Sequence, residues 1–311
     1  MQIKRKTKLI RIIGYSLLFF IFLQIILGAW IRLTGSGMSC PDWPLCYGYI
    51  FPTPSKISSL GNIEYTYFQV FLEWIHRANA AFVIGPVCIL FSSYILLKKK
   101  IYYNYTKLSY FLLILILIQG ALGGLTVFKS NIPWSVAIHL IFAFLLYLTG
   151  LLIISKTYNL SKNYILTSKF TKINTAITAL LTMAAAAAGA FTSKYGASLS
   201  CNSWPGCNDS FFPDFSDMFE LIHYAHRVIA LFLFITLAVL FFKMTSYYSM
   251  LSKKIKYILG LIFFIIIFQI MIGALLIYFG VPIWLGVFHQ ATGLMLFTLI
   301  TMLYLHMKIK D

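Results

Sequence analysis

Long apolar segments are the feature that most limits what this chain can fold into. A helix that crosses the hydrocarbon core of a bilayer needs about 20 consecutive, mainly apolar residues. The sequence contains eight such segments, at residues 10–32, 70–97, 108–128, 133–155, 172–192, 218–242, 257–279 and 282–306. Only 11% of the residues are charged, against about 25% in a typical soluble domain. The chain is therefore predicted to be an all-α polytopic membrane protein with eight transmembrane helices.

The formal net charge of +17 is concentrated in alternate loops and near both ends of the chain. The lysine clusters at residues 98–107, 156–172 and 243–256 follow this pattern, as do the basic residues before the first apolar segment. The other loops carry most of the acidic residues. This is the positive-inside pattern, which predicts that both termini are cytoplasmic. The basic loops are expected to contact anionic lipid, not nucleic acid.

An internal duplication organises the chain. A shift of 150 residues superimposes His76 on His226 and His139 on His289, and it also pairs two glutamines, two glycines and two tryptophans. A shift of 161 superimposes two upstream segments of the form Ser-Cys-x-x-Trp-Pro-x-Cys. Each half has an even number of helices, so both copies have the same orientation in the membrane. We predict two tandem four-helix bundles, residues 1–160 and 161–311, related by a pseudo-twofold axis along the membrane normal.

Four histidines lie at matching places in this duplication: His76, His139, His226 and His289. Each is six or seven residues inside the outer end of a predicted helix, or about 10 Å below the outer surface. One such histidine alone is more simply explained as a hydrogen-bonded core residue. Four at one depth favour metal ligation. Two imidazoles per bundle suit the axial positions of haem iron, because the porphyrin supplies the other four ligands, whereas a structural zinc site needs four protein ligands.

An arginine directly follows the first histidine of each half. Arg77 and Arg227 are expected near the aqueous edge, where the propionates of a bound haem would emerge. Arginine matches the geometry of a carboxylate with two parallel hydrogen bonds. The alternative is an arginine that extends to the membrane interface without a specific partner.

The two halves differ at the position three residues before this histidine. Glu73 precedes His76, whereas His223 precedes His226. Residues three apart share a helix face, so Glu73 is expected to point into the cavity of His76. A carboxylate there would act as a general base or stabilise a developing cation; the alternative is a glutamate that bonds to a loop. His223 is either an additional hydrogen-bonding group or a substitute ligand.

Cysteine pairs close a short loop in each half. Cys40 with Cys46, and Cys201 with Cys207, lie in predicted outer loops, where an oxidising compartment favours disulfides. A structural role is favoured for the second pair, and a redox role for the first pair stays open. Cys88 is read as a small buried residue within its helix, and His306 is expected at the interface.

The segment Gly28-Ala29-Trp30-Ile31-Arg32-Leu33-Thr34-Gly35-Ser36-Gly37-Met38-Ser39-Cys40-Pro41-Asp42-Trp43-Pro44-Leu45-Cys46 resembles the haem A synthase family (COX15/CtaA type), in its cysteine-containing bacterial subset. The run Glu73-Trp74-Ile75-His76-Arg77 and the three later histidines extend the resemblance over essentially the whole chain. It implies an oxidoreductase of the bacterial plasma membrane. This enzyme would convert haem O to haem A by successive hydroxylations of a ring methyl group to a formyl group, for use in terminal cytochrome oxidases.

The resemblance also implies residue roles. His226 and His289 would hold a resident haem b, His76 and His139 would hold the substrate haem O, and Glu73 would be catalytic. His223 departs from the family pattern and puts the ligand set of the haem b site in doubt. The electron acceptor is not implied, and both a homo-oligomer and direct docking of haem O synthase, a farnesyltransferase, stay open.

Two other functions compete with this one. A non-catalytic di-haem cytochrome b would use the same four histidines but would not need Glu73, and it would place its haems across the membrane rather than at one depth. A transporter is the second rival, because duplicated halves are common there. Transporters carry broken helices near the midplane, whereas the polar residues here gather near the outer edge.

Overall fold

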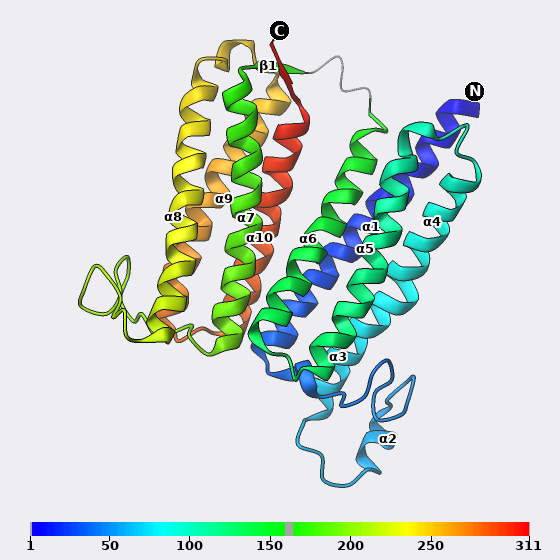
Figure 1. Cartoon of the computed structure of the whole chain (residues 1–311), viewed down its shortest axis with the longest axis vertical. Coiled ribbons are helices and arrows are strands. Elements are labelled where there is room, and N and C mark those ends of the chain that lie inside the picture. The colour runs from blue at the N-terminus through cyan, green and yellow to red at the C-terminus, as the bar shows by residue number, and fades with distance from the viewer. Residues whose placement is uncertain (1, 159–163, 311) are drawn as a thin grey trace. The chain divides into compact units, whose positions relative to one another are not determined.

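The computed structural model describes residues 2–158 and 164–310, and nearly all of its regular structure is helical (Figure 1). Eight helical spans in this part of the chain are long and apolar enough to cross a membrane: Lys8–Leu33, Tyr67–Leu97, Tyr103–Phe128, Pro133–Ser155, Lys169–Tyr195, Met218–Thr245, Lys253–Tyr278 and Ile283–Leu305. A helix satisfies its own backbone hydrogen bonds, as hydrocarbon requires. The prediction of an all-α, eight-span membrane protein is confirmed. The twofold relation between the halves stays a prediction.

The chain divides into two compact units, Met1–Thr157 and Tyr158–Asp311. The first contains the helices α1 (Gln2–Leu33), α2 (Pro54–Ser58), α3 (Tyr67–Ala78), α4 (Gly85–Leu97), α5 (Tyr103–Phe128) and α6 (Pro133–Ser155). A short 3-10 turn, η1 (Ser36–Met38), follows α1, and a π-helical segment, η2 (Asn79–Ile84), joins α3 to α4. The hydroxyl of Thr66 and the side chain of Gln69 form a capping box that starts α3.

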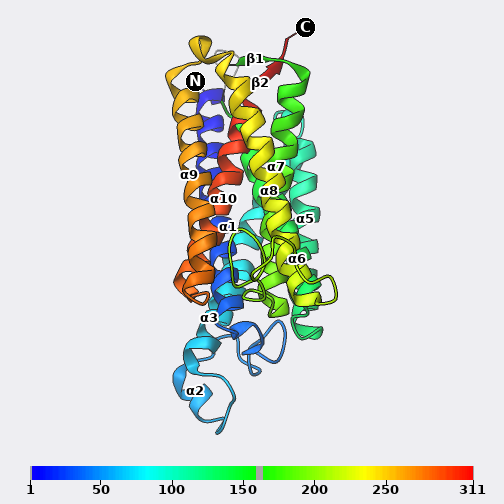
Figure 2. The ribbon, with the colours of Figure 1, turned by 90° about the vertical axis from the view of Figure 1, so that its left-hand side faces the viewer.

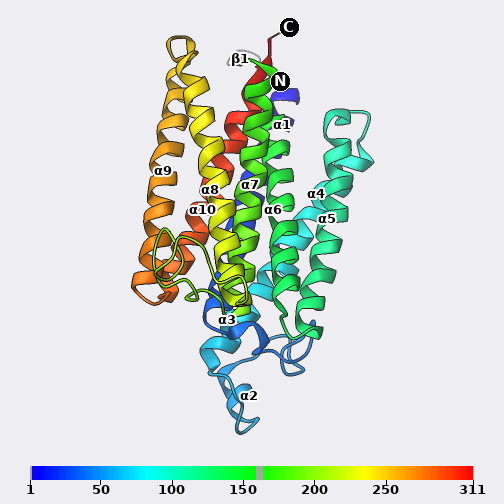
Figure 3. The ribbon, with the colours of Figure 1, turned by 60° about the vertical axis from the view of Figure 1, so that its left-hand side comes forward.

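In the first unit α1 packs against α3 and α6. Helix α5 packs against α4 and α6 (Figure 3). The close approach of α1 to α6 depends on two glycines. A Cβ atom at Gly14 would lie 2.7 Å from the Ile154 side chain, and one at Gly150 would lie 2.8 Å from the Leu18 side chain. Small residues allow membrane helices to pack this closely. α3 and α6, the helices that carry His76 and His139, both pack against α1.

The second unit contains α7 (Lys169–Tyr195), α8 (Met218–Thr245), α9 (Lys253–Tyr278) and α10 (Ile283–Leu305). Here α7 packs against both α8 and α10, and α9 packs against α10 (Figure 2). The short strand β1 (Ile165–Thr167) pairs in parallel with β2 (Met307–Ile309) and ties the end of α10 to the start of α7. His306 ends α10 directly before β2 and is only 4% exposed within the protein, and its expected place at the membrane interface stays a prediction.

Candidate ligand histidines and the disulfide loops

Each of the four predicted histidines packs its ring against a glycine of a neighbouring helix. His76 of α3 faces Gly28 of α1, His139 of α6 faces Gly123 of α5, His226 of α8 faces Gly189 of α7, and His289 of α10 faces Gly273 of α9. A Cβ atom built on these glycines would lie 3.4, 3.6, 3.1 and 3.4 Å, respectively, from the Cε1 atom of the histidine. The glycines therefore let each imidazole ring lie directly against a helix backbone.

Three of these glycines follow a glutamine by four residues, on the same helix face. The side-chain amides of Gln24, Gln119 and Gln269 donate to the backbone carbonyls of His76, His139 and His289, at 3.0, 3.2 and 3.0 Å. In α7 the matching position is Ala185. The internal duplication pairs Gln119 with Gln269. Gln24 has the same spacing to Gly28, but this similarity was not predicted.

The amide oxygens of these glutamines differ in their partners. Gln24 Oε1 accepts a hydrogen bond of 2.7 Å from Asn79 Nδ2, three residues after His76. Gln269 Oε1 accepts one from the hydroxyl of Thr292, three residues after His289. The corresponding position after His139 is Phe142, and Gln119 Oε1 is buried without a hydrogen-bond partner in the described part of the chain.

The histidine pairs fit a group that brings ligands of its own. His76 and His139 lie on α3 and α6 of the same unit, and each ring packs against a glycine of another helix in that unit. The Nδ1 atoms of His76, His139 and His226 are buried and have no hydrogen-bond partner among the described residues. No group of three or more His, Cys, Asp or Glu side chains within residues 2–158 and 164–310 is arranged to hold a metal ion. Two imidazoles in one unit with unsatisfied nitrogens suit a haem better than a zinc ion.

Both predicted cysteine pairs form disulfides. The Cα atoms of Cys40 and Cys46 are 4.7 Å apart, and those of Cys201 and Cys207 are 4.4 Å apart. Cys88 is free and buried. The loops that the disulfides close are called the Cys40–Cys46 loop and the Cys201–Cys207 loop below.

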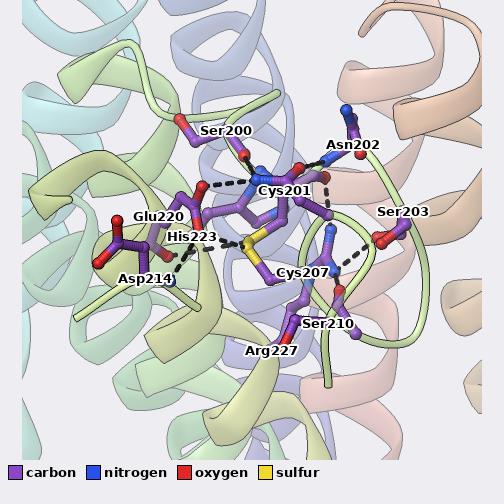
Figure 4. The surroundings of a disulfide bond; sticks show 12 residues. Ser200, Cys201, Asn202, Ser203, Cys207, Ser210, Asp214, Glu220, His223 and Arg227 are labelled. Carbon is purple, nitrogen blue, oxygen red and sulfur yellow. Dashed lines mark hydrogen bonds between the residues drawn. A yellow bond between two sulfur atoms is a disulfide. The ribbon is translucent and has the colours of Figure 1, made fainter. Parts of the chain in front are cut away.

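Arg227 holds the Cys201–Cys207 loop through its backbone carbonyls (Figure 4). Its Nη2 donates to the carbonyl of Cys201 at 2.8 Å, and its Nη1 donates to those of Ser203, at 2.8 Å, and Gly206. These three carbonyls, and that of Pro205 at 3.5 Å from Nη1, belong to different residues of one short loop. We call this arrangement the arginine clamp.

Arg77 forms the same clamp in the first unit. Its Nη2 donates to the carbonyl of Cys40 at 2.9 Å, and its Nη1 donates to those of Asp42 and Leu45, both at 2.5 Å. The shift of 161 residues carries these three positions onto Cys201, Ser203 and Gly206. The duplication thus extends from sequence to individual hydrogen bonds, which the sequence did not reveal.

Glu73 and His223 occupy matching places in the two loops. Glu73 Oε2 accepts from the backbone N–H of Cys40 at 2.9 Å and from the Ser39 hydroxyl at 3.0 Å. His223 Nδ1 accepts from the backbone N–H of Cys201 at 3.3 Å. Glu73 Oε1 also forms an ion pair of 2.6 Å with Arg77, which His223 cannot form with its own arginine. His223 is therefore a hydrogen-bonding group for the loop in this structure.

Two predicted roles are not tested by these contacts. The pairing of Arg77 and Arg227 with propionates stays a prediction, and in this structure the Nη atoms of both arginines donate to loop carbonyls. The catalytic role of Glu73 also stays a prediction, since both of its oxygens bond within the first unit.

Two loop tyrosines lie within electrostatic range of Glu73. Burial, together with the nearby charge of Glu64 and Glu73, raises the pKa of Tyr65 above its usual value. Burial raises the pKa of Tyr47 as well, with smaller contributions from Tyr65 and Glu73. Both phenols therefore stay neutral at physiological pH. In the other loop, hydrogen bonds from Ser216 lower the pKa of Asp214.

The arginine clamp gives a first testable result. Arg227→Gln removes the charged donors, and each hydrogen bond to a charged group contributes about 1.5–3 kcal/mol. We expect proteolysis within residues 196–217 of the detergent-solubilised protein to accelerate by roughly tenfold or more. The cleavage rate of Arg227→Lys should lie between those of wild type and Arg227→Gln, because a single ammonium group cannot donate to three carbonyls that are spread around the guanidinium. An unchanged cleavage rate in Arg227→Gln would show that the disulfide alone holds the loop.

Comparison with known proteins identifies relatives over most of the chain. Residues 11–301 match the family model COX15-CtaA, described as cytochrome oxidase assembly protein. The chain is 29% identical to the Heme A synthase of Shewanella oneidensis, over 92% of this chain and 93% of the relative. It is 28% identical to that of Flavobacterium psychrophilum, over 89% and 92% of the two chains. The Heme A synthase of Shouchella clausii is 26% identical, over 90% and 91%.

Proposed function

The chain belongs to the COX15-CtaA family of cytochrome oxidase assembly proteins, and we propose that it is a haem A synthase whose two halves perform different tasks. It is a multi-pass membrane protein with relatives that carry this name over nearly their whole length. Haem O is its substrate, and it is an enzyme rather than an electron carrier. The reaction would be the successive hydroxylation of a ring methyl group to a formyl group.

The two histidine pairs would hold two haems. We assign His226 and His289 to a resident haem b, and His76 and His139 to the substrate haem O. A resident haem b supplies one-electron redox chemistry when bound. The imidazole rings pack against glycines of neighbouring helices, and three glutamines donate to the histidine carbonyls. These contacts keep the imidazoles in place.

The observation that carries this division is the pair Glu73 and His223. Both side chains are buried and both accept the backbone N–H of the first cysteine in their loop. Of these two side chains only Glu73 is a carboxylate, and it lies one helical turn before His76. A buried carboxylate can take up a proton or stabilise a positive charge on a nearby substrate. The C-terminal unit has a histidine at that position, which supports a binding role for that half.

Protonation of Glu73 would remove its charge and so weaken the hydrogen bonds that it accepts from the loop and from Arg77. Oε2 holds the Cys40 N–H and the Ser39 hydroxyl, and Oε1 holds Arg77. The Cys40–Cys46 loop is therefore expected to move with the carboxylate during the reaction. The plasma-membrane location, the cytoplasmic termini and docking of haem O synthase belong to the same proposal.

Haem analysis of cells tests this function. We expect a bacterial strain without its own haem A synthase to make haem A when it produces this chain together with a haem O synthase. His76→Ala should leave haem O unconverted but keep haem b in the purified protein, whereas His226→Ala should remove haem b. Haem b retained in both variants, with haem A formation unaffected, would contradict the assignment of the two pairs. The di-haem cytochrome alternative predicts no haem A in any strain.

A further inference from the structure

Arg32 is a cation that the site described so far does not use. It lies in the last turn of α1, and its Nε atom is buried without a hydrogen-bond partner. The one ion pair among the described residues joins Glu73 to Arg77, so Arg32 has no carboxylate partner there. A guanidinium carries five donors, and burial of one of them without a partner is costly; the rest of the Arg32 side chain is partly exposed and so open to a ligand. This pattern indicates that an anion from outside the chain completes the contact.

The helix end does not account for Arg32. A basic side chain in a last turn often bonds to the final carbonyls of its helix. In α1 the hydroxyl of Thr34 donates to the carbonyl of Trp30 at 2.8 Å, and the backbone N–H of Thr34 donates to the same carbonyl at 2.9 Å. No hydrogen bond from the Arg32 guanidinium to this turn is present in the described structure.

Arg32 continues a line of residues that faces His76. Gln24 bonds to the carbonyl of His76, and Gly28 supports its ring. Arg32 is the next residue at this spacing, and residues four apart share a helix face. It lies about 6 Å further along the axis, toward the end of the unit that carries the Cys40–Cys46 loop. A ligand held by His76 would therefore reach Arg32 with groups that point toward this loop.

Arg77 is the other arginine near His76, but its donors hold three loop carbonyls and Glu73. The C-terminal unit has Ser193 at the position that the shift of 161 pairs with Arg32. The unpaired guanidinium is thus specific to the half to which we assign the substrate.

We propose that Arg32 binds a carboxylate of the tetrapyrrole held by His76 and His139, and so orients the substrate. This inference rests on the proposed function, because it requires a haem in the first unit. Arginine forms two parallel hydrogen bonds with a carboxylate, which fixes orientation as well as adding affinity. Arg32 is then a residue that positions the substrate, and Arg77 is the residue that holds the loop.

The test compares haem b, which carries free carboxylates, with its dimethyl ester. Each would be titrated into the full-length, haem-depleted protein in detergent, with the Soret absorbance as readout. The relevant binding phase is the one that His76→Ala abolishes. Wild-type protein should bind the free acid about tenfold or more tightly than the ester, and Arg32→Gln should bind both equally. Arg32→Lys should keep part of the preference.

Arg11→Gln is the matched control on the same helix. Arg11 donates to the carbonyl of Thr157 at 2.9 Å, near the other end of α1, so this variant should keep the full preference for the free acid. The same preference in wild type and Arg32→Gln would overturn the proposal. If Arg32→Gln bound the free acid and the ester more weakly by the same factor, the proposal would also be overturned. Arg32 would then not contact the haem carboxylate, and a lipid phosphate would be its partner instead. Absence of any haem binding that depends on His76 would instead reject the proposed function.

Discussion

Replacing Glu73 with glutamine is expected to lower haem A formation by about 10²–10⁴-fold, the usual contribution of a general acid or base. Glutamine keeps an oxygen that can accept the Cys40 N–H, but it can neither take up a proton nor carry a negative charge. The loop should therefore stay closed while haem O accumulates. Haem b should remain in the purified protein, because its proposed ligands lie in the other unit.

The duplication supplies the control for this variant. His223→Gln changes the side chain that accepts the Cys201 N–H in the matching loop. Whatever its effect on that loop, this variant should not lower haem A formation to a comparable extent. If Glu73→Gln retains activity within about tenfold of wild type, far short of the general-base contribution, Glu73 serves as a loop anchor and the catalytic assignment is wrong.

Gly189→Leu is expected to remove haem b from the purified protein. A Cβ atom at Gly189 would already lie 3.1 Å from Cε1 and 3.6 Å from both nitrogens of His226. A leucine side chain would need the volume that the imidazole fills, so the ring would have to leave its position. Overpacking of this kind costs about 1–3 kcal/mol where the structure can adapt, and displacement of a ligand removes the site.

Gly260→Leu in α9 is the matched control, because a Cβ at that position would meet nothing within 4 Å beyond the nearby backbone of its own helix. This variant should keep haem b and the wild-type spectrum. The comparison uses the pyridine haemochrome content of both variants per mole of protein. Full haem b content in Gly189→Leu would mean that His226 is not a ligand in this arrangement.

The helices and the disulfides were predictable because they depend on local and compositional signals. The apolar length of each segment specifies a membrane span, and the two cysteines of each loop are only six residues apart. The π-helical segment Asn79–Ile84 was not predicted. Pro86 follows it within the same span and has no backbone N–H, which favours such an irregularity.

The targets of the arginines could not be predicted from the sequence. Arg77 and Arg227 stand beside histidines, and this position suggested propionates. Their hydrogen bonds depend on how the disulfide loops fold back over the helices, which residue spacing does not reveal. Arg32 was visible only as part of a family-like motif. Its lack of a partner emerged from the packing around α1.

The haem content of the purified wild-type protein tests the central claim most directly. The full-length chain would be produced with a haem O synthase, purified in detergent, and its non-covalently bound haems extracted and separated. We predict haem b together with haem O or haem A in the same preparation. Haem b alone would contradict the assignment of a substrate haem to His76 and His139. A preparation with no haem at all would contradict the whole account of the four histidines.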